Sequence, residues 1–188
     1  MPEDPMSLDV LLVVATAREL DGRDGLVCGV GPVEAAAATA RALAQRDWGA
    51  VLHIGVAGGR GLESGSIVIG SEAVYCDLAA AIRLVDRVPA DDRLVAAAQR
   101  AVPGARVLAI GTSAAVGGAD RDVAVEAMEG FGVLRAAALA GVPALEVRAI
   151  SNEIGDPDRS RWQIDEAIAL LSAVVPALIA ALASVQRP

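Results

Sequence analysis

The chain contains no lysine, so all 16 basic residues are arginine, and 24 acidic residues give a formal net charge of −8. A P-loop of the form GxxxxGK[ST] needs a lysine for the nucleotide phosphates, so this class of site is excluded. A nucleic-acid surface needs a basic stripe that displaces counterions from phosphates. We therefore expect no nucleic-acid partner.

Aromatic, cysteine and histidine residues are also few. Four aromatic residues, Trp48, Tyr75, Phe131 and Trp162, cannot form a stacking platform for single strands. Two cysteines are too few for a disulfide scaffold, and we interpret them as buried, reduced thiols. His53 is the only histidine and no CxxC or HExxH motif occurs, so we expect neither a metal site nor another cofactor.

Two apolar segments bear on membrane targeting. The run Val10–Ala15 is short and follows acidic residues, so we predict no signal peptide and a cytoplasmic location. The segment Ala167–Val185 holds 19 residues without a charge, near the length that spans a bilayer. Because Ser172 and Pro176 interrupt it and no basic cluster precedes it, we interpret it as a buried C-terminal helix and expect no membrane partner.

The sequence has a large apolar fraction of 54%, and its 188 residues suit one domain covering 1–188. Short β-rich runs alternate with Ala-rich helical segments, which is typical of an α/β sheet covered on both faces. The predicted strands are Val10–Ala15, Leu26–Val30, Val51–Gly55, Ser66–Tyr75, Val107–Ile110 and Ala144–Ile150. The predicted helices are Val33–Gln45, Asp91–Ala101, Gly130–Ala140 and Arg161–Ala183, the last with Ser160 as its N-cap.

Gly-rich points and polar side chains follow several predicted strands, where an open α/β sheet binds its ligands. The segment from Gly29 begins like a dinucleotide-binding loop, but Glu34 replaces its third glycine and would face a pyrophosphate, so the fingerprint fails. The polar candidates are Glu19, Glu129 and Asn152. Taken singly, the two acids are equally typical of a helix first turn, and the asparagine of an ordinary turn.

Five sequence blocks carry a resemblance to a known family. They are ATARE at 15–19, CGVGPVEAA at 28–36, IGVAGG at 54–59, EAMEG at 126–130 and VRAISNEIG at 147–155. In this order they resemble the nucleoside phosphorylase/nucleosidase superfamily. Within it, the chain most resembles the branch that hydrolyses futalosine to hypoxanthine and dehypoxanthine futalosine, a step toward menaquinone. The resemblance implies a three-layer fold with a mixed central sheet flanked by helices, and a homo-oligomer.

The resemblance also implies catalytic roles that agree with the chemistry. When an N-glycosidic bond breaks, the ribose gains positive charge and the purine gains negative charge. Glu19 matches the family acid that activates the attacking water. Glu129 matches the acid that accepts hydrogen bonds from two ribose hydroxyls, and Met128 packs on the sugar. The Asn152 amide donates to a 6-oxo group and its carbonyl accepts from a protonated N7, so hypoxanthine fits better than adenine.

Further positions are implied as binding or supporting residues. The turn at 55–59 presents Val56, Ala57 and Gly58 to the nucleoside, and the loop from Thr112 runs along the base. Ser151 orients the neighbouring amide or contacts the base, and Arg148 lies behind the site, where it pairs a nearby acid. The ring that stacks on the purine is replaced by Phe131, Tyr75 or an aliphatic side chain, and the candidates for holding the substrate's aromatic carboxylate are Arg60 and Arg161.

Water is the expected nucleophile, because no arginine stands beside Gly55 to form a bidentate clamp for phosphate. Two alternatives stay open. One is an adenine-releasing nucleosidase acting on methylthioadenosine, adenosylhomocysteine or aminodeoxyfutalosine. The other is a non-catalytic purine-nucleoside binder, because the stretches after Glu19 and Gly118 are short for the family.

Overall fold

The computed structural model describes residues 8–78, 82, 84–116 and 123–186. In these residues one mixed sheet contains eight strands in the order β2-β1-β3-β7-β6-β4-β5, with β8 paired to both β3 and β4. The strands are β1 (Val10–Val14), β2 (Leu26–Val27), β3 (Ala50–Gly59), β4 (Ile67–Tyr75), β5 (Arg87–Pro89), β6 (Arg106–Thr112), β7 (Val125–Ala127) and β8 (Ala144–Glu153). All eight strands belong to one sheet. This supports the single-domain prediction, which stays a proposal.

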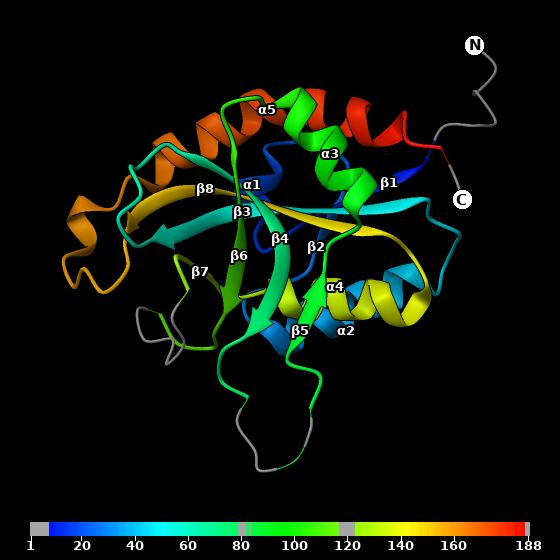
Figure 1. Cartoon of the computed structure of the whole chain (residues 1–188), viewed down its shortest axis with the longest axis horizontal. Helices are drawn as coiled ribbons and strands as arrows, with labels where there is room; N and C mark the ends of the chain where they lie inside the picture. The colour runs from blue at the N-terminus through cyan, green and yellow to red at the C-terminus, as the bar shows by residue number, and fades with distance from the viewer. Residues whose placement is uncertain (1–7, 79–81, 83, 117–122, 187–188) are drawn as a thin grey trace.

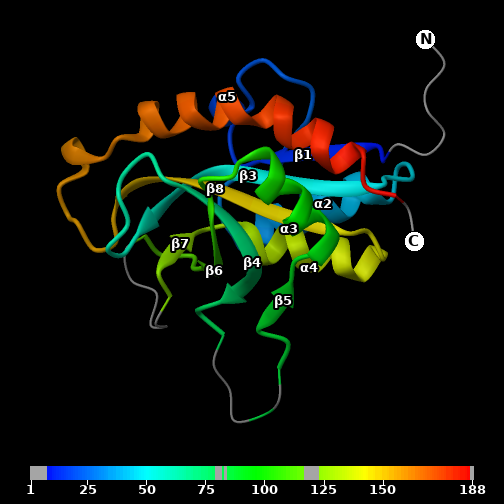
Figure 2. The same ribbon diagram turned by 45° about the horizontal axis from the view of Figure 1, so that its top comes forward.

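Helices cover the sheet on both sides. They are α1 (Ala17–Leu20), α2 (Pro32–Leu43), α3 (Asp92–Ala101), α4 (Gly130–Ala140) and α5 (Ile164–Ala183), and a 3-10 turn, η1, spans Arg159–Arg161. Figure 1 shows α3 and α5 on one face and α2 and α4 on the other, and Figure 2 shows the same layers after rotation. The predicted three-layer α/β fold with a mixed central sheet is confirmed.

The first strand shows why both faces are covered. Leu12 and Val14 belong to the core cluster that contains Leu171 of α5, whereas Leu11 and Val13 belong to the cluster under α2 and α4. Side chains alternate across a strand, so a strand buried on both faces is a continuous apolar run. The run that the sequence places at 10–15 is therefore a central strand.

The C-terminal helix packs against the sheet by one face. By length and composition this helical segment could cross a membrane. Its buried residues are Ala167, Leu171, Val175, Leu178 and Leu182, and their spacing of three or four places them on one side. The predicted core helix is confirmed, although it begins at Ile164 instead of Arg161. The Asp158 side chain, not Ser160, caps the turn that precedes it.

The third strand runs further than predicted. The sequence assigns 55–59 to a turn, yet β3 continues to Gly59, because Gly58 and Gly59 pair with β7 on one side and β8 on the other. The register shifts between Ala57 and Gly58, which marks an irregularity there. The predicted turn is therefore wrong, but its residues stay at the carboxyl end of the strand.

Candidate functional site

Three parallel strands bring distant residues to one end of the sheet. Strand β1 is parallel to β3, and β3 is parallel to β8, so their carboxyl ends lie together. A cavity of about 690 Å³ lies at this end. Its lining includes nine of the predicted site residues: Glu19, Val56, Ala57, Gly58, Met128, Glu129, Arg148, Ser151 and Asn152. The tertiary structure thus assembles residues from four separate sequence blocks.

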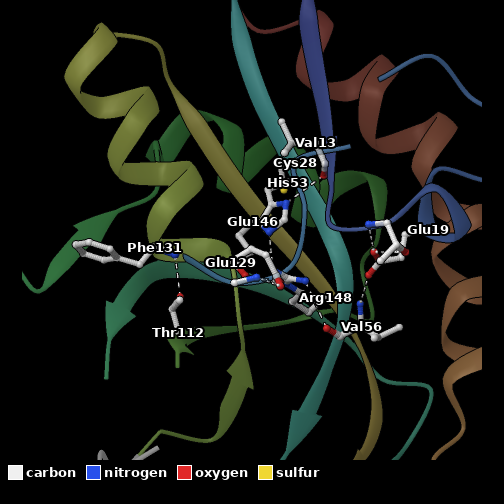
Figure 3. Close-up of polar contacts among 12 residues, drawn as sticks. Val13, Glu19, Cys28, His53, Val56, Thr112, Glu129, Phe131, Glu146 and Arg148 are labelled. Atoms are coloured by element: carbon white, nitrogen blue, oxygen red, sulfur yellow. Dashed lines mark hydrogen bonds and ion pairs between the residues drawn. The ribbon is translucent and has the colours of Figure 1, made fainter. Parts of the chain in front are cut away.

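Glu19 lies in α1, immediately after the first strand, and its carboxylate is held in place. Oε2 accepts hydrogen bonds from the Thr16 backbone N–H at 2.9 Å and the Thr16 hydroxyl at 3.0 Å. Oε1 accepts one from the Val56 backbone N–H at 3.3 Å (Figure 3). Glu19 is therefore a helix first-turn acid and a cavity residue at once, and only 7% of it is exposed.

Glu129 is the N-cap residue of α4 and is also nearly buried. Its Oε1 accepts a hydrogen bond from the Gly31 backbone N–H at 3.1 Å, and its Oε2 accepts one from Arg148 at 3.4 Å. The first contact depends on close packing of α2 and α4, because a Cβ on Gly132 would overlap the Pro32 carbonyl oxygen. The glycine-containing turn before α2 therefore supports the carboxylate with a backbone donor.

Arg148 lies at the centre of the site, with 1% of its side chain exposed. Nε donates to Glu146 Oε1 at 2.7 Å, and the two Nη groups donate to Val56 O, His53 and Glu129 (Figure 3). Burial disfavours the guanidinium charge, but Glu146 and Glu129 outweigh it, and the pKa of Arg148 is raised. The predicted pairing of Arg148 with a nearby acid is present, and Arg148 also lines the cavity.

His53 is fully buried behind Arg148. Its Nδ1 lies 3.0 Å from Val13 O and its Nε2 lies 2.5 Å from Arg148 Nη2. Because a backbone oxygen only accepts and a guanidinium only donates, the ring carries its proton on Nδ1 and accepts at Nε2. Burial and the Arg148 charge keep the pKa of His53 well below 6.5, so the ring is neutral. Sequence motifs did not reveal this residue.

Glu146 completes the group behind the site. It is fully buried, and burial raises its pKa despite the attraction of Arg148. Its Oε2 has no hydrogen-bond partner among the described residues, and it lies against Gly130, where any Cβ would overlap it. Three carboxyl groups, those of Glu19, Glu129 and Glu146, therefore surround one guanidinium, which biases this end of the cavity toward cationic groups.

Asn152 follows the buried part of β8, and its amide is partly engaged. Its Oδ1 accepts from the Ser151 hydroxyl at 2.8 Å, and its Nδ2 donates to Glu153 O at 3.0 Å. An amide nitrogen carries two hydrogens, so one N–H is left for a ligand. The geometry supports the predicted orienting role of Ser151 and favours Asn152 as a donor.

The expectations about the ring residues and about Thr112 itself are corrected, whereas the loop that begins at Thr112 reaches the cavity lining at Val116. Thr112 is buried outside the cavity lining, and its hydroxyl accepts from the Phe131 backbone N–H at 2.8 Å, near the start of α4. Phe131 and Tyr75 stack on each other at 5.0 Å instead of lining the cavity. The aromatic residue in the lining is Trp162, which motif comparison did not single out. The stretch after Gly118 falls mostly outside the described residues.

The arginines at the cavity also differ from the sequence candidates. Arg60 and Arg161 are absent from its lining, whereas Arg18 and Arg159 contribute to it. Arg18 forms an ion pair with Asp165 at the start of α5. Among the described residues, no group of three or more His, Cys, Asp and Glu side chains is arranged to hold a metal ion.

Comparisons with known proteins agree with this geometry. Residues 25–185 match the model of the phosphorylase superfamily. The chain is 37% identical to a futalosine hydrolase of Streptomyces coelicolor, over 87% of this chain and 81% of the relative. It is 33% identical to a futalosine hydrolase of Acidothermus cellulolyticus, over 89% and 79% of the two chains.

Solved structures show the same fold at lower identity. A 5'-methylthioadenosine/S-adenosylhomocysteine nucleosidase from Colwellia psychrerythraea in complex with adenine superposes with a TM-score of 0.85, at 22% identity over 96% of this chain and 98% of that one. A futalosine hydrolase mutant of Helicobacter pylori gives 0.82, at 14% identity over 92% and 98%. The chain belongs to the phosphorylase superfamily, among the nucleosidases, and its curated relatives there are futalosine hydrolases.

Proposed function

We propose that this chain is a nucleosidase that hydrolyses the N-glycosidic bond of futalosine, releasing hypoxanthine and dehypoxanthine futalosine on the way to menaquinone. The observation that carries the proposal is the convergence of Glu19, Glu129 and Asn152 on one cavity. The two relatives described above support futalosine as the nucleoside.

The sugar binds at the Glu129 carboxylate. Gly31 and Arg148 hold its two oxygens from behind, which leaves their remaining lone pairs for two vicinal ribose hydroxyls. Met128 lines the cavity beside it and supplies an apolar contact. As the glycosidic bond stretches, the ribose gains positive charge, and a fixed carboxylate stabilises that charge more than the neutral ground state.

Glu19 acts as the general base for the attacking water. Thr16 and Val56 fix both of its oxygens. The carboxylate accepts one proton of the water as the water oxygen bonds to the anomeric carbon and the bond from that carbon to the purine breaks, and a base of this kind contributes about 10²–10⁴-fold. The purine leaves as an anion and takes a proton from solvent water to become hypoxanthine. Glu19 Oε1 and Arg148 Nη1 both lie over Gly55, where no side chain separates them.

Asn152 stabilises the leaving purine. Its remaining amide N–H donates to the 6-oxo group as negative charge develops there. An amide has no acidic proton to transfer, so its contribution is a hydrogen bond to the departing base. A 6-amino purine offers no acceptor at the 6-position, and the unmatched polar pair costs about 1–3 kcal/mol.

The arrangement of arginines favours water over phosphate as nucleophile. Among the arginines that line the cavity, Arg148 is held by Glu146 and Glu129, and Arg18 is paired with Asp165. Neither guanidinium is free to bind a phosphate dianion in the bidentate manner that phosphorolysis needs. Arg159, the third arginine of the lining, lies beside Trp162 in the segment between β8 and α5, and not beside Glu19 or Glu129.

A chromatographic assay of the released base tests the proposal. Purified protein is incubated with futalosine, methylthioadenosine or aminodeoxyfutalosine, each with and without phosphate. We expect hypoxanthine from futalosine at a rate independent of phosphate. Release of adenine alone contradicts the substrate, a requirement for phosphate contradicts hydrolysis, and binding without any base release indicates a non-catalytic binder.

We also propose that the protein is a homo-oligomer in the cytoplasm. Val27, Val30 and Val33 are 44%, 55% and 74% exposed, and Val30 also lines the cavity, so a second copy covering this surface reaches the substrate site. Cys28 and Cys76 are buried and form no disulfide in the part of the chain that the structure describes, which is compatible with a reducing compartment. Size-exclusion chromatography with light scattering measures the mass of the assembly, and the mass of a monomer contradicts the proposed homo-oligomer.

A further inference from the structure

The outer half of the cavity suggests how the substrate's tail is recognised, an inference that rests on the proposed function. Futalosine carries an aromatic carboxylate beyond its ribose. The inner cavity is lined by Glu19, Glu126 and Glu129, in a chain of net charge −8. These carboxylates repel the substrate's carboxylate unless a nearby cation compensates its charge. An enzyme for this substrate therefore needs a positive group at the outer end.

The segment between β8 and α5 forms that outer end. In Figures 1 and 2 this segment, in orange, lies beyond the ends of β3 and β8. Pro157, Trp162, Ile164 and Ile168 from this region line the cavity and offer an apolar surface that suits an aromatic ring. The Trp162 indole N–H donates to Asp156 O at 3.3 Å, which fixes the orientation of the ring.

Three arginines line the cavity, and they differ in their partners. Arg148 is buried in the inner half with Glu146 and Glu129, and Arg18 is paired with Asp165. Arg159 makes no ion pair in the part of the chain that the structure describes, and its guanidinium carbon lies 5.3 Å from the centroid of the Trp162 ring. It is exposed to solvent and to the cavity, and its charge is available to a ligand.

The local sequence explains why this guanidinium stays free. The acids nearest to it in the turn are Asp156 and Asp158, and both pair with Arg161 instead, at 2.6 Å and 3.6 Å. Arg161 therefore pairs with both aspartates, including Asp156, which also lines the cavity. Arg159, two residues earlier, extends over Trp162, where cation–π attraction holds it beside the apolar surface.

We propose that Arg159, held over Trp162, binds the carboxylate of the substrate's aromatic tail and selects nucleosides that carry this anion. The planar guanidinium binds a carboxylate through two parallel hydrogen bonds, while the ring of the tail packs on Trp162. In this proposal the two ends of the cavity differ in charge. The inner end carries the carboxylates near which the ribose becomes cationic, and the outer end carries the Arg159 guanidinium that binds the anionic tail. This assignment replaces Arg60 and Arg161 as the carboxylate partners.

A double cycle tests the proposal by removing the charge of Arg159, the charge of the substrate carboxylate, or both. Wild-type protein and Arg159→Gln are assayed with futalosine and with its methyl ester, which keeps the ring and loses the anion. For futalosine we expect kcat/KM to fall about ten- to a hundredfold in the variant, mainly through KM, the range of one charge-assisted hydrogen bond. For the ester we expect the two proteins to agree within twofold.

Controls separate this contact from a general charge effect. Arg60→Gln removes the same charge outside the cavity lining and should leave kcat/KM for futalosine and for its methyl ester at the wild-type values. Arg159→Lys keeps the charge without the planar fork and should recover part of the loss. Equal losses of Arg159→Gln on acid and ester, or an ester that wild-type protein uses as well as the acid, overturn the proposal.

The outcome also distinguishes this inference from the function beneath it. If wild-type protein releases no hypoxanthine from futalosine, the proposed function fails. Calorimetric binding of futalosine and its ester to Glu19→Gln and to Glu19→Gln/Arg159→Gln then still decides the role of Arg159. We expect the acid to bind the single variant at least tenfold more tightly than the double variant, and the ester to bind both equally.

Discussion

His53 Nε2 accepts a hydrogen bond from Arg148 Nη2 at 2.5 Å, so a neutral histidine orients a guanidinium that contacts both Glu129 and Glu146. The histidine in turn donates from Nδ1 to Val13 O in the first strand. The His53 ring therefore links the backbone of the central sheet to Arg148, which lines the cavity, and fixes the position of its guanidinium. His53 is a positioning residue, because it acts on the site through Arg148.

Two substitutions of His53 separate its two hydrogen bonds. Asn has an amide at the position of Nδ1 and does not reach Arg148, whereas Gln reaches the position of Nε2 and can accept from it. We expect His53→Asn to lower kcat at least tenfold and His53→Gln to lower it clearly less, with similar KM values. Steady-state kinetics on the two folded variants check this, and equal losses argue against a positioning role.

The same histidine makes stability depend on pH. Its pKa is lowered in the folded protein, so below about pH 6.5 the unfolded chain binds a proton that the native ring does not. The free energy of unfolding should therefore fall as pH drops from 7.5 to 5, by up to about 1.4 kcal/mol per pH unit below 6.5. Glu146, whose pKa is raised, acts in the opposite direction above pH 4.5.

Urea unfolding of wild-type protein and His53→Gln across this range isolates the histidine. The contribution of Glu146 is common to both proteins, so the slopes should differ by the histidine alone. A variant whose stability falls as steeply as that of wild-type protein shows that His53 does not cause the pH dependence.

Gly55 leaves room for two charged groups over the third strand. A Cβ at this position would overlap Arg148 Nη1 and lie 2.8 Å from Glu19 Oε1. We expect Gly55→Ala to displace both side chains, lower kcat at least tenfold and destabilise the fold by about 1–3 kcal/mol. Gly104→Ala is the control, because a Cβ there meets nothing within 4 Å. Thermal unfolding and kinetics of both variants decide the matter.

Glu19→Gln keeps the shape of the proposed base and removes its basicity. The amide oxygen can still accept from Thr16, so the turn should persist. We expect turnover to fall at least a hundredfold while substrate affinity changes little. Glu34→Gln, a neutralised acid in the first turn of α2 and outside the cavity lining, should have wild-type turnover. Full activity in Glu19→Gln would remove this residue from the mechanism.

Asn152→Asp tests how the 6-position of the base is read. The carboxylate can still accept from Ser151, but it loses the N–H that donates to the purine. We expect the ratio of hypoxanthine to adenine release from matched nucleosides to fall at least tenfold. The measurement is a competition between futalosine and aminodeoxyfutalosine, and an unchanged ratio means that the amide does not select the base.

Local sequence patterns predicted the elements whose ends are marked by local signals. Helix α4 has the predicted bounds of 130 and 140, because its apolar face and the following Gly141 in the left-handed region are local signals. The patterns failed at β5 and β7, which have three residues each. Such short strands exist only because β4, β6 and β3 offer them edges, and this pairing is invisible along the chain.

The candidate site divides in the same way. The motifs were sufficient to single out Glu19, Glu129 and Asn152 as residues that line the cavity. His53 and Trp162 carry no comparable pattern. Their roles depend on which side chains surround them, and those neighbours come from strands and turns far away in the sequence.

The sequence by itself determined the alternation of strands and helices, the acidic character of the chain and the order of the polar residues at the strand ends. These are properties of composition and local pattern. Only the tertiary structure decided that three parallel strands end at one cavity, that a neutral histidine holds Arg148, and that Arg159 stays free while Arg161 is paired. Burial, charge compensation and hydrogen-bond partners depend on distances in space, and the folding of the whole chain sets those distances.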